Sequence, residues 1–236
     1  TGYARVRRPD PRIAAAIREA LGDARTVVNV GAGAGSYEPR DLDVVAVEPS
    51  ATMIEQRPLN AAPVVQANAE QLPFADDAFD AAMAVLTIHH WADWRRGIAE
   101  MRRVARRVVL LTWDPEVGRD FWLFAYLGEM AEVDTARFMA TSELIEALEP
   151  CRVIDVPIPE DCTDGFLAAY WKRPRAYLDP AVRAGISSFS LEVDVTRGLA
   201  RLADAIDSGR WAVRWADLLA RERLDAGYRL LVCDSR

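Results

Sequence analysis

The sequence has few cysteines, no long apolar run and no excess of positive charge. Its three cysteines, Cys151, Cys162 and Cys233, are widely spaced and odd in number. They exclude the disulfide framework of a small secreted domain and the paired spacing of a zinc ribbon, and they favour a reducing cytoplasm. Asp, Glu or Arg interrupts the apolar stretches before they reach the about 20 residues that a membrane span needs. A membrane protein is therefore excluded.

Charge and composition narrow the class of protein further. The 236 residues carry a net charge of −7, which argues against a nucleic-acid backbone as the main partner. Residues 1–9 contain Arg5, Arg7 and Arg8 but no apolar segment, so we expect no signal peptide there. Hydrophobic residues make up 51% of the chain and charged residues 28%, which suits one generous domain, or a domain with a lid, and excludes disorder.

Strand-like apolar runs alternate with helical segments over the first half of the chain. Residues 26–30 form a β-branched run that ends at Gly31, as expected of a strand buried on both faces. Similar runs occupy 43–47, 64–66, 79–86 and 107–113, and helical patterns occupy 11–21, 52–57 and 94–105. This alternation predicts an α/β fold with a Rossmann-like, doubly wound sheet of mostly parallel strands.

The second half of the chain has a different rhythm. We expect helices at 119–133 and 142–148, a strand at 152–158 and a last strand at 228–233, for a sheet of about seven strands. The roughly 65 residues before the last strand are too many for a plain connection. We therefore predict a core of residues 1–158 and 227–236, and a helical lid of residues 159–226 inserted before the last strand.

A glycine-rich loop follows the first predicted strand. Gly31, Gly33 and Gly35 permit a turn with positive φ and let the backbone approach a ligand closely. Ser36 stands where a dinucleotide-binding fingerprint has its third glycine, which counts against a nicotinamide cofactor. Glu48 lies at the carboxyl end of the second predicted strand, where an acid accepts hydrogen bonds from a ribose diol.

These residues resemble the class I S-adenosylmethionine-dependent methyltransferases, and within them the small-molecule branch often called type 11 or UbiE-like. The resemblance is carried by the segments 27–35, 45–50, 67–74 and 79–91, in this order and at matching intervals. It implies S-adenosylmethionine as cofactor and S-adenosylhomocysteine as product. The implied cofactor contacts are the loop residues Gly31, Ala32, Gly33 and Gly35, the ribose ligand Glu48, the adenine neighbours Pro49, Met53, Asn68 and Ala69, the sulfonium neighbour Leu86, and the N-terminal residues Tyr3 and Arg8 over the cofactor carboxylate.

Two asparagines depart from the pattern of the resembled family. Members usually have an acidic residue at the position of Asn29, and often Asp at the position of Asn68. Asparagine still forms hydrogen bonds but brings no negative charge toward a cationic cofactor, so we expect weaker cofactor binding. The departures also keep open a non-catalytic subunit or sensor that binds the cofactor without turnover. A nicotinamide-dependent oxidoreductase is a further, less favoured alternative.

His89 and His90 are the only histidines, and they directly follow the fourth predicted strand. In a doubly wound fold the ligand crevice lies at this end of the strands, so either histidine is a candidate base for an acceptor. The alternative is that the run from His89 to Trp91 packs the start of the next helix. We expect adjacent histidines at a strand end to point apart, which argues against a metal site made with Asp93.

The expected acceptor is a small, partly apolar organic molecule, a metabolite or natural-product intermediate. Trp91, Tyr170 and Trp171 are candidate acceptor contacts, and the last two lie in the predicted insertion that distinguishes acceptor classes. The alternative for Tyr170 and Trp171 is ordinary lid core. The sequence thus predicts a cytoplasmic methyltransferase with a small-molecule acceptor and no metal, nucleic-acid or membrane partner.

Overall fold

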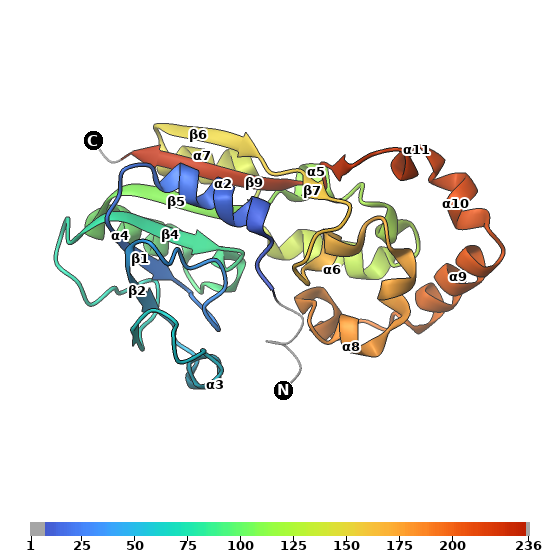
Figure 1. Ribbon diagram of the computed structural model, residues 1–236, viewed down its shortest axis with the longest axis horizontal. Helices are drawn as coiled ribbons and strands as arrows, with labels where there is room; N and C mark the ends of the chain where they lie inside the picture. Colours follow the sequence, from blue (N-terminus) through green and yellow to red (C-terminus); the bar gives the residue numbers. More distant parts are fainter. Residues whose placement is uncertain (1–7, 235–236) are drawn as a thin grey trace. The chain divides into compact units, whose positions relative to one another are not determined.

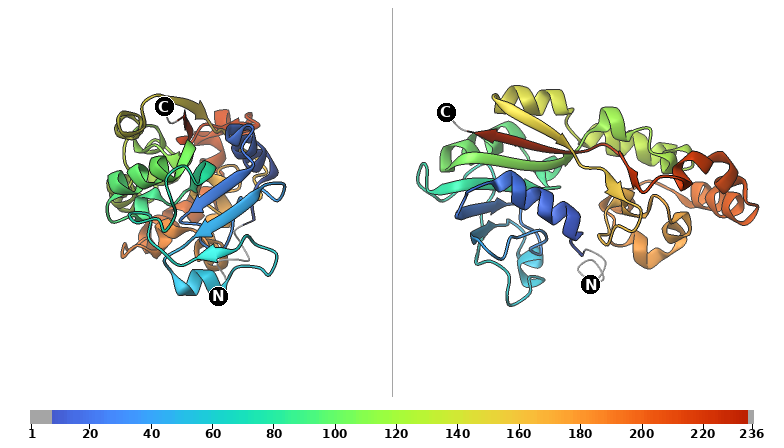
Figure 2. Two further views of the ribbon diagram at one scale, coloured as in Figure 1. Left: turned by 90° about the vertical axis from the view of Figure 1, so that its left-hand side faces the viewer. Right: turned by 45° about the horizontal axis from the view of Figure 1, so that its top comes forward.

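The computed structural model describes residues 8–234 and divides them into two compact units (Figures 1 and 2). The core unit comprises residues 11–114, 139–156 and 229–234. The second unit comprises residues 8–10, 115–138 and 157–228. The predicted lid of 159–226 therefore differs from the observed second unit, which also takes in 115–138. No helix among residues 8–234 is long and apolar enough to cross a membrane.

The core unit is built on a seven-stranded sheet with the order β3-β2-β1-β4-β5-β9-β6, which confirms the predicted fold class. Strands β1 to β5 pair in parallel, and β6 pairs antiparallel with β9. The strands are β1 (Thr26–Val30), β2 (Asp43–Val47), β3 (Val64–Val65), β4 (Phe79–Val85), β5 (Ala105–Trp113), β6 (Cys151–Asp155) and β9 (Tyr228–Asp234).

Helices cover both faces of this sheet, which explains why its central strands are apolar throughout. Helix α2 (Pro11–Leu21) lies on one face, and α4 (Trp94–Val104) and α7 (Thr141–Leu148) lie on the other (Figures 1 and 2). Val28 and Val30 of β1 are fully buried, as are Val108 of β5 and Met101 of α4. Parallel strands that are buried on both faces lose the in–out alternation of a half-exposed sheet.

The connection from β1 to β2 contains no helix, although parallel strands are usually joined by one. Residues 31–42, all described by the structure, are turns and loop. Gly31, Gly33, Gly35 and Tyr37 all have positive φ, at 71°, 52°, 91° and 64°. A right-handed helix cannot pass through left-handed residues at every second position, so this crossover stays irregular.

The second unit consists of short helices. Where the sequence predicted one helix over 119–133, the structure has α5 (Pro115–Gly118), a 3₁₀ turn η2 (Trp122–Ala125) and α6 (Gly128–Arg137). The prediction of a single helix is wrong because Trp122, Leu123 and Phe124 are all buried. Consecutive residues of a surface helix face different directions, so a regular helix cannot bury such a run. The other elements are β7 (Ile158–Pro159), η3 (Leu167–Tyr170), η4 (Pro174–Leu178), α8 (Pro180–Arg183), η5 (Ser187–Ser190), α9 (Thr196–Asp207), α10 (Arg210–Arg214), α11 (Ala216–Leu219) and β8 (Arg223–Leu224).

An aromatic cluster fills the interior of the second unit. The ring of Trp122 lies 5.1 Å from that of Trp211, 5.6 Å from that of Tyr177 and 6.5 Å from that of Trp215. The Trp122 indole N–H donates to the carbonyl of Trp171 at 2.8 Å. The Trp122 ring meets those of Tyr177 and Trp211 edge to face, an arrangement that stabilises buried rings. This aromatic cluster forms the interior of the second unit, as the sheet does in the core unit.

Cys151 and Cys233 form a disulfide, so the expectation of unpaired cysteines is wrong. They face each other in the β6–β9 register, with their Cα atoms 4.3 Å apart. The two residues are 82 positions apart, and only the antiparallel pairing of β6 with β9 brings them together. Cys162 is buried and free, and burial raises the pKa of its thiol to about 12.

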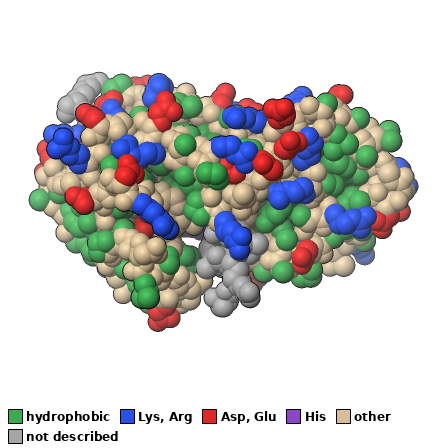
Figure 3. Space-filling model, in the orientation of Figure 1, with side chains coloured by type: hydrophobic (Ala, Val, Ile, Leu, Met, Phe, Trp, Pro, Cys, Tyr) green, Lys and Arg blue, Asp and Glu red, His purple; other side chains and the backbone are tan. Residues whose placement is uncertain are grey.

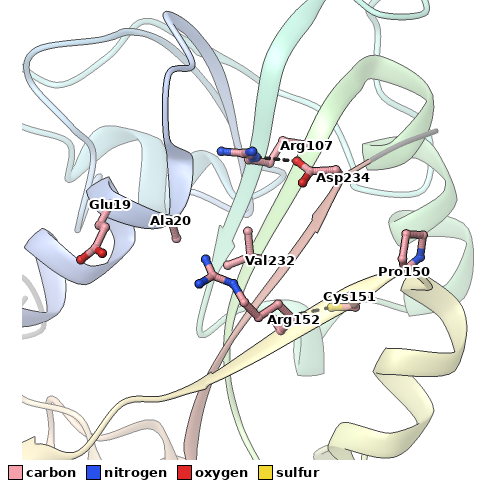
Figure 4. Close-up of a pocket in the computed structure, with 8 residues that line it drawn as sticks. All are labelled: Glu19, Ala20, Arg107, Pro150, Cys151, Arg152, Val232 and Asp234. Atoms are coloured by element: carbon pink, nitrogen blue, oxygen red, sulfur yellow. Dashed lines mark hydrogen bonds and ion pairs between the residues drawn. The ribbon is translucent and has the colours of Figure 1, made fainter.

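Cys151 also lines a cavity of about 410 Å³ between α2, β5, β6 and β9 (Figure 4). In that view Arg107 of β5 and Asp234 of β9 form an ion pair at 2.7 Å on the wall of the cavity. Arg107 lies near the amino end of β5, so this cavity is at the opposite edge of the sheet from the glycine loop. Figure 3 shows acidic and basic side chains interspersed on the visible face of each unit.

Candidate functional site

The glycine loop meets the acid of β2 at the carboxyl edge of the core sheet. The backbone N–H groups of Gly31 and Ala32 donate to the carbonyl of Val47 at 2.8 and 3.0 Å, which fixes the loop to the end of β2. The next N–H, that of Gly33, donates to Glu48 Oε2 at 2.8 Å. β1 lies at the topological switch point, with β2 on one side and β4 on the other, where open α/β sheets bind their ligands.

Glu48 is buried, with 7% of its surface exposed, and both of its oxygens are held by backbone. Oε1 accepts from Ser50 N–H at 2.9 Å, and Oε2 accepts from Gly33. Ser50 in turn caps helix α3 (Ala51–Glu55), because its side chain accepts from Met53 N–H at 3.3 Å. A carboxylate offers about four acceptor positions, so two remain for a pair of hydroxyl groups. The residues present therefore fit a ribose.

Thr87 faces the glycine loop from the end of β4. A side chain on Gly31 would overlap the hydroxyl and methyl groups of Thr87, so glycine is required there. Leu86, the predicted sulfonium neighbour, precedes Thr87 with φ of 52°, and its N–H donates to Leu111 carbonyl at 2.8 Å. A left-handed leucine costs about 1–2 kcal/mol, and such strain concentrates at functional sites. The sequence did not identify Thr87 as a contact of the glycine loop, because a single threonine after a strand belongs to no recognisable motif.

The predicted adenine neighbours lie around the end of β2. Met53 of α3 is half-buried, and its Cε lies 3.4 Å from the position that a Gly33 Cβ would occupy. Ala69 belongs to the buried core with Val47, whereas Pro49 and Asn68 are exposed. Exposure leaves the polar groups of Asn68 accessible to a ligand. The N–H of Gly33 donates to Glu48, and Met53 lies close to Gly33, whereas the exposed Asn68 lies in the segment after β3.

His89 and His90 lie in a 3₁₀ turn, η1 (Ile88–His90), between β4 and α4. His89 is half-buried and His90 is exposed. Their ring centroids are 4.0 Å apart, so the expectation that they point apart is wrong. The tight turn, rather than an extended strand end, brings the rings to the same side. Across residues 8–234, no group of three or more His, Cys, Asp or Glu residues is arranged to hold a metal ion.

Trp91 packs under the start of α4. A side chain on Gly97 would overlap the indole ring, and Trp91 contacts the buried core of the unit. These contacts give Trp91 a packing role, and this role holds whether or not its exposed surface also contacts a ligand. Arg103 of α4 donates to the carbonyls of Leu72 and Phe74 at 3.0 and 2.8 Å and so holds the loop before β4.

The remaining predicted contacts belong to the second unit or lie outside the described residues. Tyr3 lies outside the described residues, and Arg8 is exposed in the second unit. Tyr170 and Trp171 are buried in the second unit. The indole N–H of Trp171 donates to the carbonyls of Ile158 and Pro159 at 3.0 and 3.1 Å, which is the geometry of a core residue.

A glycine loop, a buried acid at the end of β2 and the strand order 3-2-1-4-5 with an antiparallel β6–β9 pair together define a class I methyltransferase fold. Comparisons with known proteins agree. The family described as a methyltransferase domain matches residues 28–111. A crystal structure of a putative methyltransferase from an antibiotic biosynthesis pathway of Anabaena variabilis is 33% identical, with a TM-score of 0.90 over 97% of this chain and 98% of that chain. The chain belongs to the S-adenosylmethionine-dependent methyltransferases.

Three further proteins are matched over less of their length. A chloroplastic 2-methyl-6-phytyl-1,4-hydroquinone methyltransferase of Oryza sativa is 32% identical over 117 residues, which are 44% of this chain and 33% of that protein. A second rice protein of this name is matched over 42% of its length, so the similarity spans less than half of these relatives. Geranyl diphosphate C-methyltransferase from Streptomyces coelicolor, 18% identical with a TM-score of 0.56 over 95% of this chain and 79% of that chain, shares the fold.

Proposed function

We propose that the protein transfers a methyl group from S-adenosylmethionine to a small, partly apolar organic acceptor. The observation that carries the proposal is the buried Glu48 carboxylate, which is hydrogen-bonded to Gly33 N–H and keeps two acceptor positions for ribose hydroxyls. S-adenosylmethionine, when bound, supplies an electrophilic methyl group on a sulfonium and leaves as S-adenosylhomocysteine. The protein itself contributes binding, alignment and exclusion of water, which are what an in-line displacement requires.

Each cofactor contact has a role that follows from its chemistry. Gly31 and Gly33 let the backbone approach the cofactor, since neither carries a side chain. Met53 and Asn68 flank the adenine, one by apolar contact and the other by hydrogen bonds through its exposed amide. Arg8, with Tyr3 beside it in the sequence, is proposed to bind the cofactor carboxylate, because a guanidinium pairs with a carboxylate through two hydrogen bonds.

His90 is the proposed base for an acceptor that carries a hydroxyl group, with His89 beside it. The acceptor oxygen gives its proton to the His90 imidazole and receives the methyl group, and the bond from that methyl group to sulfur breaks. His90 is the exposed member of the pair, which supports the choice. Its replacement by glutamine is expected to remove a limb of the pH profile of turnover, since glutamine cannot take the proton. Turnover that keeps this limb would leave His90 with a packing role.

Hydroquinones and other phenols come first among acceptors to screen, since rice relatives are named as hydroquinone methyltransferases and the cyanobacterial relative as belonging to antibiotic biosynthesis. The acceptor site is proposed to be lined by Trp91, Tyr170 and Trp171. Tyr170 and Trp171 are buried, so they would contact an acceptor only where part of their side chains becomes exposed. Trp91→Leu should then raise the acceptor KM without changing the affinity for S-adenosylhomocysteine. An equal loss of both would assign Trp91 to packing alone.

Calorimetric titration with S-adenosylhomocysteine, with NADH in a parallel cell, tests the cofactor site. We expect binding of S-adenosylhomocysteine and none of NADH. Glu48→Ala should weaken binding by about 1–3 kcal/mol, because ribose hydroxyls lose their acceptors. Glu55→Ala is the matched control, since Glu55 is an exposed acid on α3 close in sequence. Unchanged affinity in Glu48→Ala would remove Glu48 from the site, and binding without turnover across the phenol panel would favour a cofactor-binding subunit.

A further inference from the structure

A buried ion pair lies behind the glycine loop. Arg57 follows α3, Glu38 lies in the β1–β2 crossover, and Arg57 Nη2 is 2.7 Å from Glu38 Oε1. The two side chains are only 5% and 8% exposed. Charges this deeply buried persist only when their other hydrogen-bonding groups are satisfied.

The loop backbone and its surroundings supply those hydrogen bonds. Arg57 Nη1 donates to the carbonyl of Gly33 at 3.1 Å, and Arg57 Nη2 also donates to the carbonyl of Ala62 at 3.0 Å. Glu38 Oε2 accepts from Ala62 N–H at 3.1 Å, and Glu38 Oε1 accepts from the Asn29 amide at 3.3 Å. The pair therefore ties the end of β1, the glycine loop and the segment after α3 into one network.

Gly33 links this network to the cofactor site. Its carbonyl accepts from Arg57, and its N–H donates to Glu48, so one peptide unit on each side of Gly33 is fixed. At Gly35, which has φ of 91°, a Cβ would lie 3.3 Å from both Arg57 Nη1 and Glu38 Oε2. The loop thus packs tightly against the ion pair, and the positive φ of Gly35 favours glycine there.

We propose that Asn29, Glu38 and Arg57 hold the glycine loop in the conformation that binds the cofactor, in place of the crossover helix that residues 31–42 lack. The proposal rests on the proposed cofactor site at Glu48. Arg57 and Glu38 act through the Gly33 backbone and are positioning residues. A helix at this place would orient and support the loop through its first turn. Here a guanidinium and a carboxylate from separate segments do so.

The network also gives a physical reason for asparagine at position 29. Asn29 is 1% exposed, and its amide donates to Glu38. An aspartate at the same position would place a second buried carboxylate beside Glu38, and two adjacent carboxylates cannot both be ionised without a large cost. Because Glu38 already supplies the negative charge, position 29 must donate a hydrogen bond. The usual acid of the family is therefore excluded by the residue at 38.

Replacing Arg57 by methionine tests the positioning role. We expect the Kd for S-adenosylhomocysteine to rise at least about tenfold, with one site per chain, at a temperature well below the unfolding midpoint. A purely structural role would lower the midpoint and leave Kd of the folded protein unchanged, and that result would overturn the proposal. Arg18→Met is the control, because Arg18 forms an exposed ion pair with Asp41 of the same crossover.

Near-isosteric replacements test the proposal where Arg57→Met does not fold. Asn29→Asp should weaken S-adenosylhomocysteine binding about tenfold. Glu38→Gln should also weaken it, because one amide oxygen cannot accept from Arg57, Asn29 and Ala62 N–H together, as the two carboxylate oxygens do. Equal or tighter binding in either variant contradicts the network. Glu48→Ala run in parallel separates the two ideas: if it also binds normally, the cofactor site itself is misplaced.

Discussion

The core unit and the second unit both bury apolar side chains, but they do so by different means. In the core, strands such as β1 and β4 are held in register by their backbones, and valine and alanine fill the layers between sheet and helices. In the second unit the longest helix is α9, and the only strand pair, among the described residues, joins two residues of β7 to two of β8. Its order comes from contacts among large rings. In the core unit, many backbone hydrogen bonds and small apolar side chains share the stabilisation. In the second unit, a few large side chains provide most of it.

The largest expected effect comes from Trp171, a buried residue of the second unit whose backbone carbonyl accepts from the Trp122 indole. Trp171 is fully buried and its N–H is satisfied by two carbonyls, so Trp171→Ala removes both packing and hydrogen bonds. We expect it to lower the free energy of unfolding by about 3–5 kcal/mol. Urea unfolding followed by tryptophan fluorescence measures this.

Val213→Ala is the control for that measurement, because Val213 lies in the same unit and is 81% exposed. It should change stability by less than about 0.5 kcal/mol. If Trp171→Ala were equally mild, the contrast between a concentrated and a distributed core would fail.

Reduction of the disulfide comes next in size. Cys151 and Cys233 bracket residues 157–228, so the bond closes a long loop in the unfolded chain. Cys151→Ser with Cys233→Ser should lower the free energy of unfolding by about 2–4 kcal/mol. Mass spectrometry of the intact, unreduced protein first tests whether the two thiol hydrogens are absent. Cys162→Ser is the control, because it removes a thiol that is not part of the disulfide. If adding reductant lowered the free energy of unfolding of the double variant by the same amount, the reductant would be acting elsewhere in the protein.

We also expect Asp80 of the core unit to make a smaller, pH-dependent contribution to the free energy of unfolding. The N–H groups of Thr26 and Arg25 and the Thr26 hydroxyl donate to the Asp80 carboxylate, and they lower its pKa from 3.8 to about 2. Because this pKa is lower in the folded than in the unfolded state, its stabilisation is present above about pH 4 and is lost as pH falls toward 2.

Asp80→Asn should therefore cost about 1 kcal/mol at pH 7, with allowance for a partly exposed carboxylate, and flatten the fall in stability between pH 4 and 2. Unfolding midpoints across that range measure the effect. Asp207→Asn breaks an exposed ion pair with Arg175 in the second unit and should change stability by less than about 0.5 kcal/mol. A pH dependence that survives in Asp80→Asn would point to other acids.

The contrast between the units also explains what the sequence could predict. Helix 11–21 and strands 26–30 and 43–47 are observed with the predicted bounds, because their apolar periodicity reflects the sheet layers directly. The run 121–126 misled the prediction, since its rings are buried by partners such as Tyr177 and Trp211, far away in the chain. The Gly33–Glu48 contact agrees with the motif, whereas the Glu38–Arg57 pair has no local signal.

The place of β9 in the sheet has a consequence for biosynthesis. β9 lies between β5 and β6, and in the described sheet it is the only neighbour of β6. On the ribosome, β6 emerges well before its partner, since residues 157–228 must be made first. Until then β5 has an open edge and β6 has no strand to pair with, a state that invites wrong pairing between nascent chains. Folding of the core unit is thus completed only after residues 157–228 of the second unit have been synthesised.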